Sequence, residues 1–195
     1  MKPLSFCSFD EAQFNGIYHL LCRAFKLSKP ELTDFYTSLR AGFHDADWPP
    51  EIFADRTFFS SHSKSFQSKY NNAETIACDL PSLFSRGSQK TVMIIAQDPL
   101  NSNPAENIWI GTPYGLHIKK MREEKRTKLY MQLIEILLHH GYQTYLTDFY
   151  KIYVRGATLP KVDRHLFADI LKQEVELIKP TAIITWGKIA SNVVT

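Results

Sequence analysis

The sequence predicts an α/β protein of three layers, in which helices cover both faces of a short central parallel sheet and a helical N-terminal extension packs on this core. Two observations favour this fold. The apolar, β-branched run Val92–Ile95 ends at Asp98-Pro99, which is typical of a strand buried on both faces. From Thr91 onward, strand-like runs alternate with helical patterns, which favours right-handed crossovers between parallel strands.

Length and composition set the outer limits. A chain of 195 residues can build one well-cored domain and is short for two. No apolar run approaches the roughly 20 residues that span a bilayer, and Met1–Phe6 lacks the apolar core of a signal peptide. We therefore expect a cytoplasmic protein with no membrane partner.

The net charge and the cysteine content exclude few classes of function and indicate few binding partners. The net charge of +3 permits a nucleic-acid partner without arguing for one. Cys7, Cys22 and Cys78 are far apart and form no CxxC pair, so neither a disulfide framework nor a zinc site is suggested. We expect no metal.

Residues 1–90 are expected to form a mostly helical extension on the core. Ser8 and Glu11 make a capping-box pattern at the start of a helix from Phe9 to Phe25. Ser28 and Pro30 open a second helix. Its predicted buried face consists of Leu32, Phe35, Tyr36 and Leu39.

The remainder of the chain divides into an irregular stretch and the α/β core. Asp45–Gln89 has no sustained period, so irregular structure with short helices is expected there, and residues 91–195 form the core of one compact domain. The predicted core elements are a strand at Val92–Ala96, a helix at Arg122–His140, a strand at Gln143–Thr147, a helix capped by Asp163 and stopped by Pro180, and a strand at Thr181–Thr185. The first of these helices is expected to bury Leu129, Tyr130, Leu133, Ile136 and Leu137 and to be followed by Gly141.

The three predicted strands end at Asp98, Asp148 and Gly187. The carboxyl ends of parallel strands meet at one edge, where open α/β sheets bind ligands. A carboxylate there can orient a water molecule or stabilise a developing cation. Because Asp-Pro also initiates turns, the alternative is that Asp98 only shapes the backbone, and Asp148 has the same alternative.

A long connection follows the first strand. Residues 101–118 hold Trp109, Tyr114 and His117 beside glycines, which suits a pocket that stacks a flat ligand, although a self-packed surface loop fits equally well. The segment His117–Lys128 then contains six Lys or Arg against two Glu. This charge favours phosphate binding or forms a solvated helix face.

Several chemistries are not supported. The sequence contains neither GxGxxG nor GxxxxGK[ST], so no dinucleotide fold or phosphate loop is indicated. It also lacks GxSxG and HExxH, which argues against a serine hydrolase and a zinc protease.

Four segments, in this order, resemble motifs of the uracil-DNA glycosylase superfamily. Ala96–Leu100 resembles the GQDPY water-activating loop, with Ala for Gly and Leu for Tyr. Gly115–Ile118 resembles the GLxF element, with Ile118 at the aromatic position that stacks on the flipped base. Leu146–Asp148 is similar to the LLN strand end, with Asp148 for the amide that reads the base, and Trp186–Ala190 resembles the WGxxA turn.

The resemblance implies excision of a damaged base from single- or double-stranded DNA by a monomer, without metal or cofactor. Asp98 would orient water towards the sugar C1′ as the glycosidic bond breaks. The implied substrate-binding residues are Gln97, Pro99, Leu100, Tyr114, Gly115, Leu116, His117, Ile118 and Asp148. The implied contacts to the DNA backbone are Lys119, Lys120, Lys125 and Lys188.

The family's second catalytic motif, an HPS-type loop after the last strand, does not occur in these 195 residues. Either the sequence is part of a longer protein, or this lineage dispenses with that half of the site. Loss of the motif's histidine is expected to cost on the order of 10²–10³ in rate. The alternative functions are a non-catalytic nucleic-acid-binding or interaction domain on the same fold and, third, a hydrolase of free nucleosides.

Overall fold

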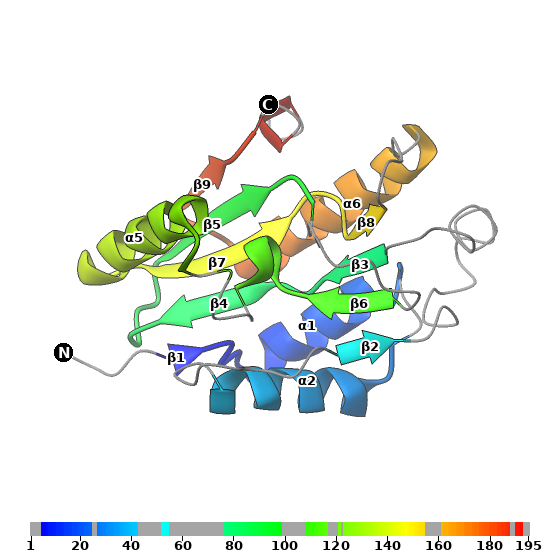
Figure 1. Cartoon of the computed structure of the whole chain (residues 1–195), viewed down its shortest axis with the longest axis horizontal. Coiled ribbons are helices and arrows are strands. Elements are labelled where there is room, and N and C mark those ends of the chain that lie inside the picture. Colours follow the sequence, from blue (N-terminus) through cyan, green and yellow to red (C-terminus); the bar gives the residue numbers. More distant parts are fainter. Residues whose placement is uncertain are drawn as a thin grey trace.

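The computed structural model describes residues 5–24, 27–42, 52–54, 76–98, 108–116, 121, 123–154, 161–187 and 190–192. The predicted α/β class is confirmed. A five-stranded sheet has helix α5 (Lys125–His139) on one face and helices α1 (Glu11–Leu21) and α6 (Lys161–Ile178) on the other (Figure 1). No helix in the described ranges is long and apolar enough to cross a membrane.

The main sheet contains the predicted parallel strands and two strands from the N-terminal part. Its order is β1 (Ser5–Phe6), β4 (Ser82–Ser85), β7 (Gln143–Asp148), β5 (Thr91–Ala96) and β9 (Ala182–Thr185). Strand β5 pairs in parallel with both β7 and β9, whereas β4 and β1 add antiparallel strands beside β7. All six residues of β5 are buried, as its apolar run predicts.

A second sheet, which the sequence did not predict, lies beside the carboxyl end of the main sheet (Figure 1). Its order is β2 (Ile52–Ala54), β6 (Ile108–Gly111), β3 (Ile76–Asp79) and β8 (Ile152–Val154). The expectation of irregular structure with short helices is therefore wrong for the described parts of 45–89. Strands of three or four residues show no period, and partners far apart in sequence determine whether they form.

Helix α1 begins with a capping box two residues later than the sequence predicts. Asp10 is its N-cap, and the carboxylate accepts a hydrogen bond from the Gln13 N–H at 2.8 Å. The Gln13 side chain accepts one from the Asp10 N–H at 3.3 Å. Ser8 and Glu11 have the same spacing, so spacing alone could not decide between the two pairs.

Helix α2 (Lys29–Gly42) agrees closely with its prediction. The Ser28 N–H donates to the Glu31 carboxylate at 2.8 Å, and the Glu31 N–H donates to the Ser28 hydroxyl at 3.3 Å. The predicted face is buried, namely Leu32, Phe35, Tyr36 and Leu39. The Tyr36 hydroxyl donates to the Pro81 carbonyl at 2.7 Å, which fixes the helix against the start of β4.

The rotation of α5 differs from the prediction. Leu129 and Ile136 are 61% and 54% exposed, whereas Thr127, Ile134 and Leu138 are buried. Apolar residues occupy more than half of this helix's circumference. The apolar pattern is therefore compatible with several rotations of the helix about its axis, and packing against β7 and β4 selects one of them.

Helix α6 begins at Lys161, so Asp163 lies in its first turn and is not the N-cap. Phe167, Ile170 and Leu171 form its buried face. Leu177, on the same side of the helix as Ile170, approaches α1 closely, because a Cβ on Gly16 would lie 2.6 Å from its side chain.

Gly141 ends α5 with the predicted left-handed turn, at φ +80°. The Gly141 and Tyr142 N–H groups donate to the carbonyls of Leu138 and Leu137 at 3.3 and 3.0 Å, which is a Schellman motif. Nothing lies within 4 Å of a Cβ at position 141, so only the backbone conformation opposes a side chain there.

We expect Gly141→Ala to lower the free energy of unfolding in urea by about 1–2 kcal/mol, and Gly141→Asn to lower it less, because Asn tolerates this conformation. Equal stability of all three proteins would contradict this account.

Candidate functional site

The carboxyl ends of the three parallel strands form one edge of the main sheet. Ala96 of β5 is the ladder partner of Asp148 of β7. On the other side, the Trp186 N–H donates to the Ile95 carbonyl at 2.8 Å directly after β9. The residues that the sequence placed at this edge therefore come together there.

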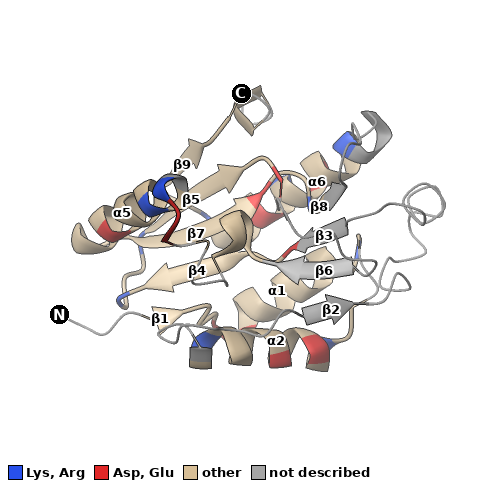
Figure 2. Cartoon of the chain, viewed as in Figure 1, with Lys and Arg blue, Asp and Glu red and all other residues tan. Residues whose placement is uncertain are grey.

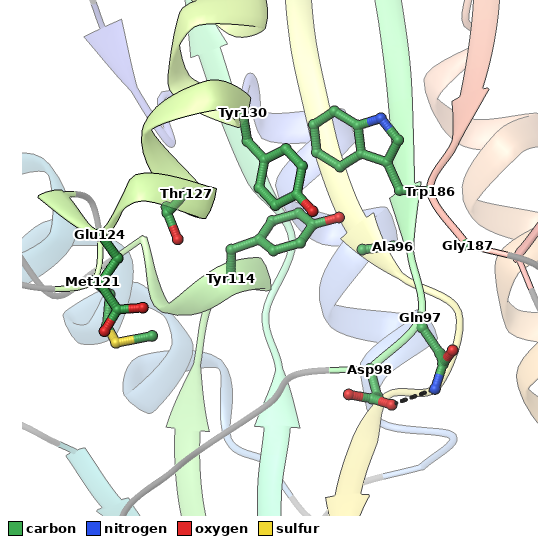
Figure 3. A pocket seen from close by; sticks show the side chains of 10 residues that line it. All are labelled: Ala96, Gln97, Asp98, Tyr114, Met121, Glu124, Thr127, Tyr130, Trp186 and Gly187. Carbon is green, nitrogen blue, oxygen red and sulfur yellow. Dashed lines mark hydrogen bonds between the residues drawn. The ribbon is translucent and has the colours of Figure 1, made fainter.

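A cavity of about 270 Å³ opens at this edge, close to the lower end of the roughly 300–1,000 Å³ typical of small-molecule sites. It is lined by Ala96, Gln97, Asp98, Tyr114, Met121, Glu124, Thr127, Tyr130, Trp186 and Gly187 (Figure 3). The lining comes from the ends of β5 and β9, the 3₁₀ turn η3 (Pro113–Gly115) and the start of α5.

Three aromatic rings form one side of the cavity, and we call them the aromatic wall: Tyr114, Tyr130 and Trp186. Tyr130 and Trp186 are stacked, with ring centroids 4.2 Å apart and planes at 25°. Tyr114 contacts both, at 4.3 Å from Tyr130 and 5.3 Å from Trp186. Figure 3 shows Gln97 and Asp98 on the other side of the cavity from these rings.

The backbone of Tyr114 supports a functional role for its ring. Tyr114 has φ +59° and ψ +12°, a left-handed conformation that costs a non-glycine residue roughly 1–2 kcal/mol. Strain of this kind concentrates at ligand sites. Its neighbour Gly115 also has positive φ, so two successive residues of η3 are in the left-handed region where the Tyr114 ring joins the wall.

Asp98 is half-buried at the cavity, and hydrogen bonds hold both its side chain and the main chain before it. The Gln97 amide Nε2 donates to Asp98 Oδ2 at 2.9 Å. The main chain just before it continues to pair with the exit of β7, since Phe149 N–H donates to Ala96 O at 2.9 Å and Tyr150 N–H to Gln97 O at 3.0 Å. The main chain that leads to Asp98 is therefore anchored to the exit of β7, and the carboxylate is oriented by Gln97.

Asp148 is fully buried, and within the described part of the chain neither carboxyl oxygen has a hydrogen-bond partner. Burial raises its pKa well above the ordinary value, and the charges of Asp79 and Asp98 add to this. The neutral acid is therefore favoured. A neutral carboxyl has one donor and one acceptor, as an amide does, whereas an ionised carboxylate only accepts.

Beneath this edge lies a buried ion-paired cluster that the sequence analysis missed, formed by Asp79, Lys151 and Glu174. The Lys151 ammonium lies 3.1 Å from Asp79 Oδ2 and 2.7 Å from Glu174 Oε2, and all three side chains are at most 2% exposed. Thr147 and Tyr145 complete it, because both hydroxyls donate to Glu174, at 3.1 and 2.9 Å.

Burial and neighbouring charges have opposite effects on the pKa values of Lys151 and Asp79. Burial alone would lower the pKa of Lys151, but the charges of Glu174 and Asp79 outweigh it and raise this pKa. Burial raises the pKa of Asp79 to about 6, against the opposing charge of Lys151. The sequence contained a signal for the cluster: Glu174 lies on the apolar face of its helix, and Lys151 follows a buried strand between aromatic and apolar residues.

The other predicted site residues divide into two groups. Gly115 and Leu116 are buried but do not line the cavity, and Lys125 is exposed at the start of α5, where Figure 2 shows Lys and Arg residues. Outside the described residues lie Pro99, Leu100, His117, Ile118, Lys119, Lys120 and Lys188. Trp186 and Tyr130, which the sequence analysis did not assign to the site, complete the wall.

Comparison of the chain with protein-family models, with curated proteins and with solved structures found no match. Among the described residues, no group of three His, Cys, Asp or Glu side chains is arranged to hold a metal ion. The features that bear on function are the cavity, the carboxyl groups of Asp98 and Glu124 in its lining, and the aromatic wall.

The buried Asp148 carboxyl predicts a pH dependence of stability. Its raised pKa means that the folded protein keeps a proton that the unfolded chain loses above about pH 4. This contribution to stability is complete below that pH and is lost as pH rises towards the pKa of the folded state. We expect wild type to lose stability relative to Asp148→Asn by up to about 1.4 kcal/mol per pH unit over this range. Urea unfolding curves between pH 4 and 8 test this, and a constant difference would contradict it.

Proposed function

We propose that the chain is a DNA glycosylase-like protein that hydrolyses the N-glycosidic bond of uracil or another damaged base in DNA. The observation that supports this most strongly is the position of one carboxylate, Asp98, across a single cavity from an aromatic wall. A flat base needs a surface on which to stack, and the bond to its sugar needs a positioned water molecule.

In the proposed reaction, the target nucleotide leaves the duplex and its base stacks on the wall. The Asp98 carboxylate accepts a hydrogen bond from water and directs its oxygen to C1′. As the glycosidic bond breaks, its electron pair leaves with the base, and the same carboxylate stabilises the positive charge that develops on the sugar. The water oxygen bonds to C1′, its proton passes to Asp98, and the released base takes up a proton from solvent. The hydrogen bond from Gln97 fixes the orientation of Asp98 before the substrate arrives.

Asp148 suits the recognition of a base edge that has one donor and one acceptor. It is fully buried and is not among the residues that line the cavity, but its ladder partner Ala96 does line it, and the two side chains share one face of the sheet. A neutral carboxyl there pairs with a ring N–H beside a carbonyl, as in uracil and hypoxanthine. An ionised carboxylate would instead require two donors on the base.

The catalytic proposal is tested by release of base from oligonucleotides that carry uracil or hypoxanthine. We expect Asp98→Asn to lower the rate by about 10²–10⁴-fold, because the amide is a much weaker proton acceptor for the water. Asp34→Asn, an exposed acid on α2, is the matched control and should leave the rate unchanged. Equal rates for wild type and Asp98→Asn, or no release by wild type, would refute the proposal.

Non-catalytic binding of nucleic acid is the second candidate, and the exposed Lys125 and Lys128 in the first turn of α5 favour it, although Glu123 and Glu124 directly precede them (Figure 2). We expect Lys125→Gln to weaken DNA binding for all sequences and to reduce the salt dependence by about one ion. Lys90→Gln is the control, because Lys90 is exposed at the opposite end of β5. Salt-sensitive binding that survives Asp98→Asn, without base release, would favour this second function. Equal effects of the two lysine variants would contradict a DNA surface beside the cavity.

A further inference from the structure

The cluster of Asp79, Lys151 and Glu174 contacts the main chain of the candidate site as well as its own members. The Asp148 N–H donates to Asp79 Oδ2 at 3.1 Å, and Lys151 Nζ donates to the Asp148 carbonyl at 2.8 Å. The Asp79 N–H donates to the Lys151 carbonyl at 2.8 Å, which closes the ring. Both peptide groups of Asp148 are thus held by charged side chains.

Further hydrogen bonds connect this turn to Gln97, the residue that precedes Asp98. Phe149 and Tyr150 follow Asp148 directly, and their N–H groups donate to the carbonyls of Ala96 and Gln97 at 2.9 and 3.0 Å. A displacement of the turn at 148–151 therefore moves the exit of β5. The path from Lys151 to Asp98 consists only of main chain and hydrogen bonds.

Stability alone does not account for such a cluster. Removing charges from water costs several kcal/mol per ion, and apolar residues of similar volume often serve a fold as well or better. Here the charges lie at the carboxyl edge of the sheet and hold main-chain atoms of the cavity edge.

We propose that Asp79, Lys151 and Glu174 are positioning residues of the site, which fix the turn after β7 and, through it, the exit of β5 that bears Asp98. The kinetic part of this inference rests on the proposed function, and the structural part does not. None of the three lines the cavity, so they act through the main chain.

The experiment compares Lys151→Met/Glu174→Gln with Glu174→Gln alone. The double variant removes the ammonium that holds the Asp148 carbonyl without leaving two unpaired carboxylates, and the single variant keeps that ammonium. Amide hydrogen exchange at Phe149 and Tyr150 is measured against Ile94 in the centre of β5. In the double variant we expect at least tenfold faster exchange at 149 and 150 relative to Ile94, and no relative change in the single variant.

Base release supplies the second readout. We expect kcat of the double variant to fall by about 10–100-fold with little change in KM, because Asp98 is misplaced while the stacking surface remains. If wild type releases no base, the exchange result still decides the structural part, so the two proposals fail separately. Exchange that rises equally at all amides, or a kcat equal to that of the single variant, would overturn the inference.

A pH series covers the case in which the double variant does not fold. The pKa of Asp79 is about 6, so protonation below that pH weakens the bond to Lys151. The ionisable groups that face Asp79 are Lys151 after β7, Asp148 and Tyr145 on β7, Glu174 on α6 and Tyr36 on α2. Protection at Phe149 and Tyr150 should fall relative to Ile94 between pH 7 and 5 in wild type and stay constant in Asp79→Asn. A constant ratio in wild type would overturn the inference.

Discussion

The parallel pairing of β5 with both β7 and β9 is the constraint on which the rest of the structure depends. A strand with hydrogen-bonded neighbours on both sides and helices on both faces must be apolar along its length, and β5 is buried at every residue. Polar side chains can therefore occur only at the ends of β5. The three strands run in the same direction, so their carboxyl ends meet at one edge of the sheet. This common direction is enough to bring together Asp98, Asp148 and Trp186.

Charge at this edge is the second constraint. Three buried or half-buried carboxyl groups, Asp79, Asp98 and Asp148, lie close enough for the pKa of Asp148 to respond to the other two. The single cation in this part of the described structure, Lys151, bonds Asp79 and Glu174 and only the main chain of Asp148. The cluster thus leaves the Asp148 side chain without a counter-ion, and burial then favours its neutral form. Burial, reinforced by the charge of Asp79, therefore sets the protonation state of Asp148, and the charge of Lys151 opposes it only in part.

The sequence predicted the parts of this arrangement that are local. The buried run before Asp98, the helix face from Leu32 to Leu39 and the turn at Gly141 depend on residues close in the chain, and each was found. The second sheet and the ion-paired cluster depend on contacts over long separations, such as Asp79 with Lys151 and Glu174, for which one sequence has no period. Tyr130 was expected only in the core, because the rotation of α5 decides that its ring meets Trp186.

Under the proposed function, the geometry of the aromatic wall limits how a base could bind. Tyr130 and Trp186 are already stacked at 4.2 Å, so no gap for a base exists between them. Separating two rings forfeits about 0.5–1.5 kcal/mol, whereas stacking a base on an aromatic ring gains about 1–3 kcal/mol. Insertion would also require the end of β9 and helix α5, which carry the two rings, to move apart, whereas stacking on an outer face of the wall requires no such movement. Extruding a base from a duplex costs a few kcal/mol, least for a mismatched or unpaired base. Stacking on one face gains about as much free energy as it costs to extrude a mismatched or unpaired base. The proposed function therefore favours bases that are weakly paired in the free DNA.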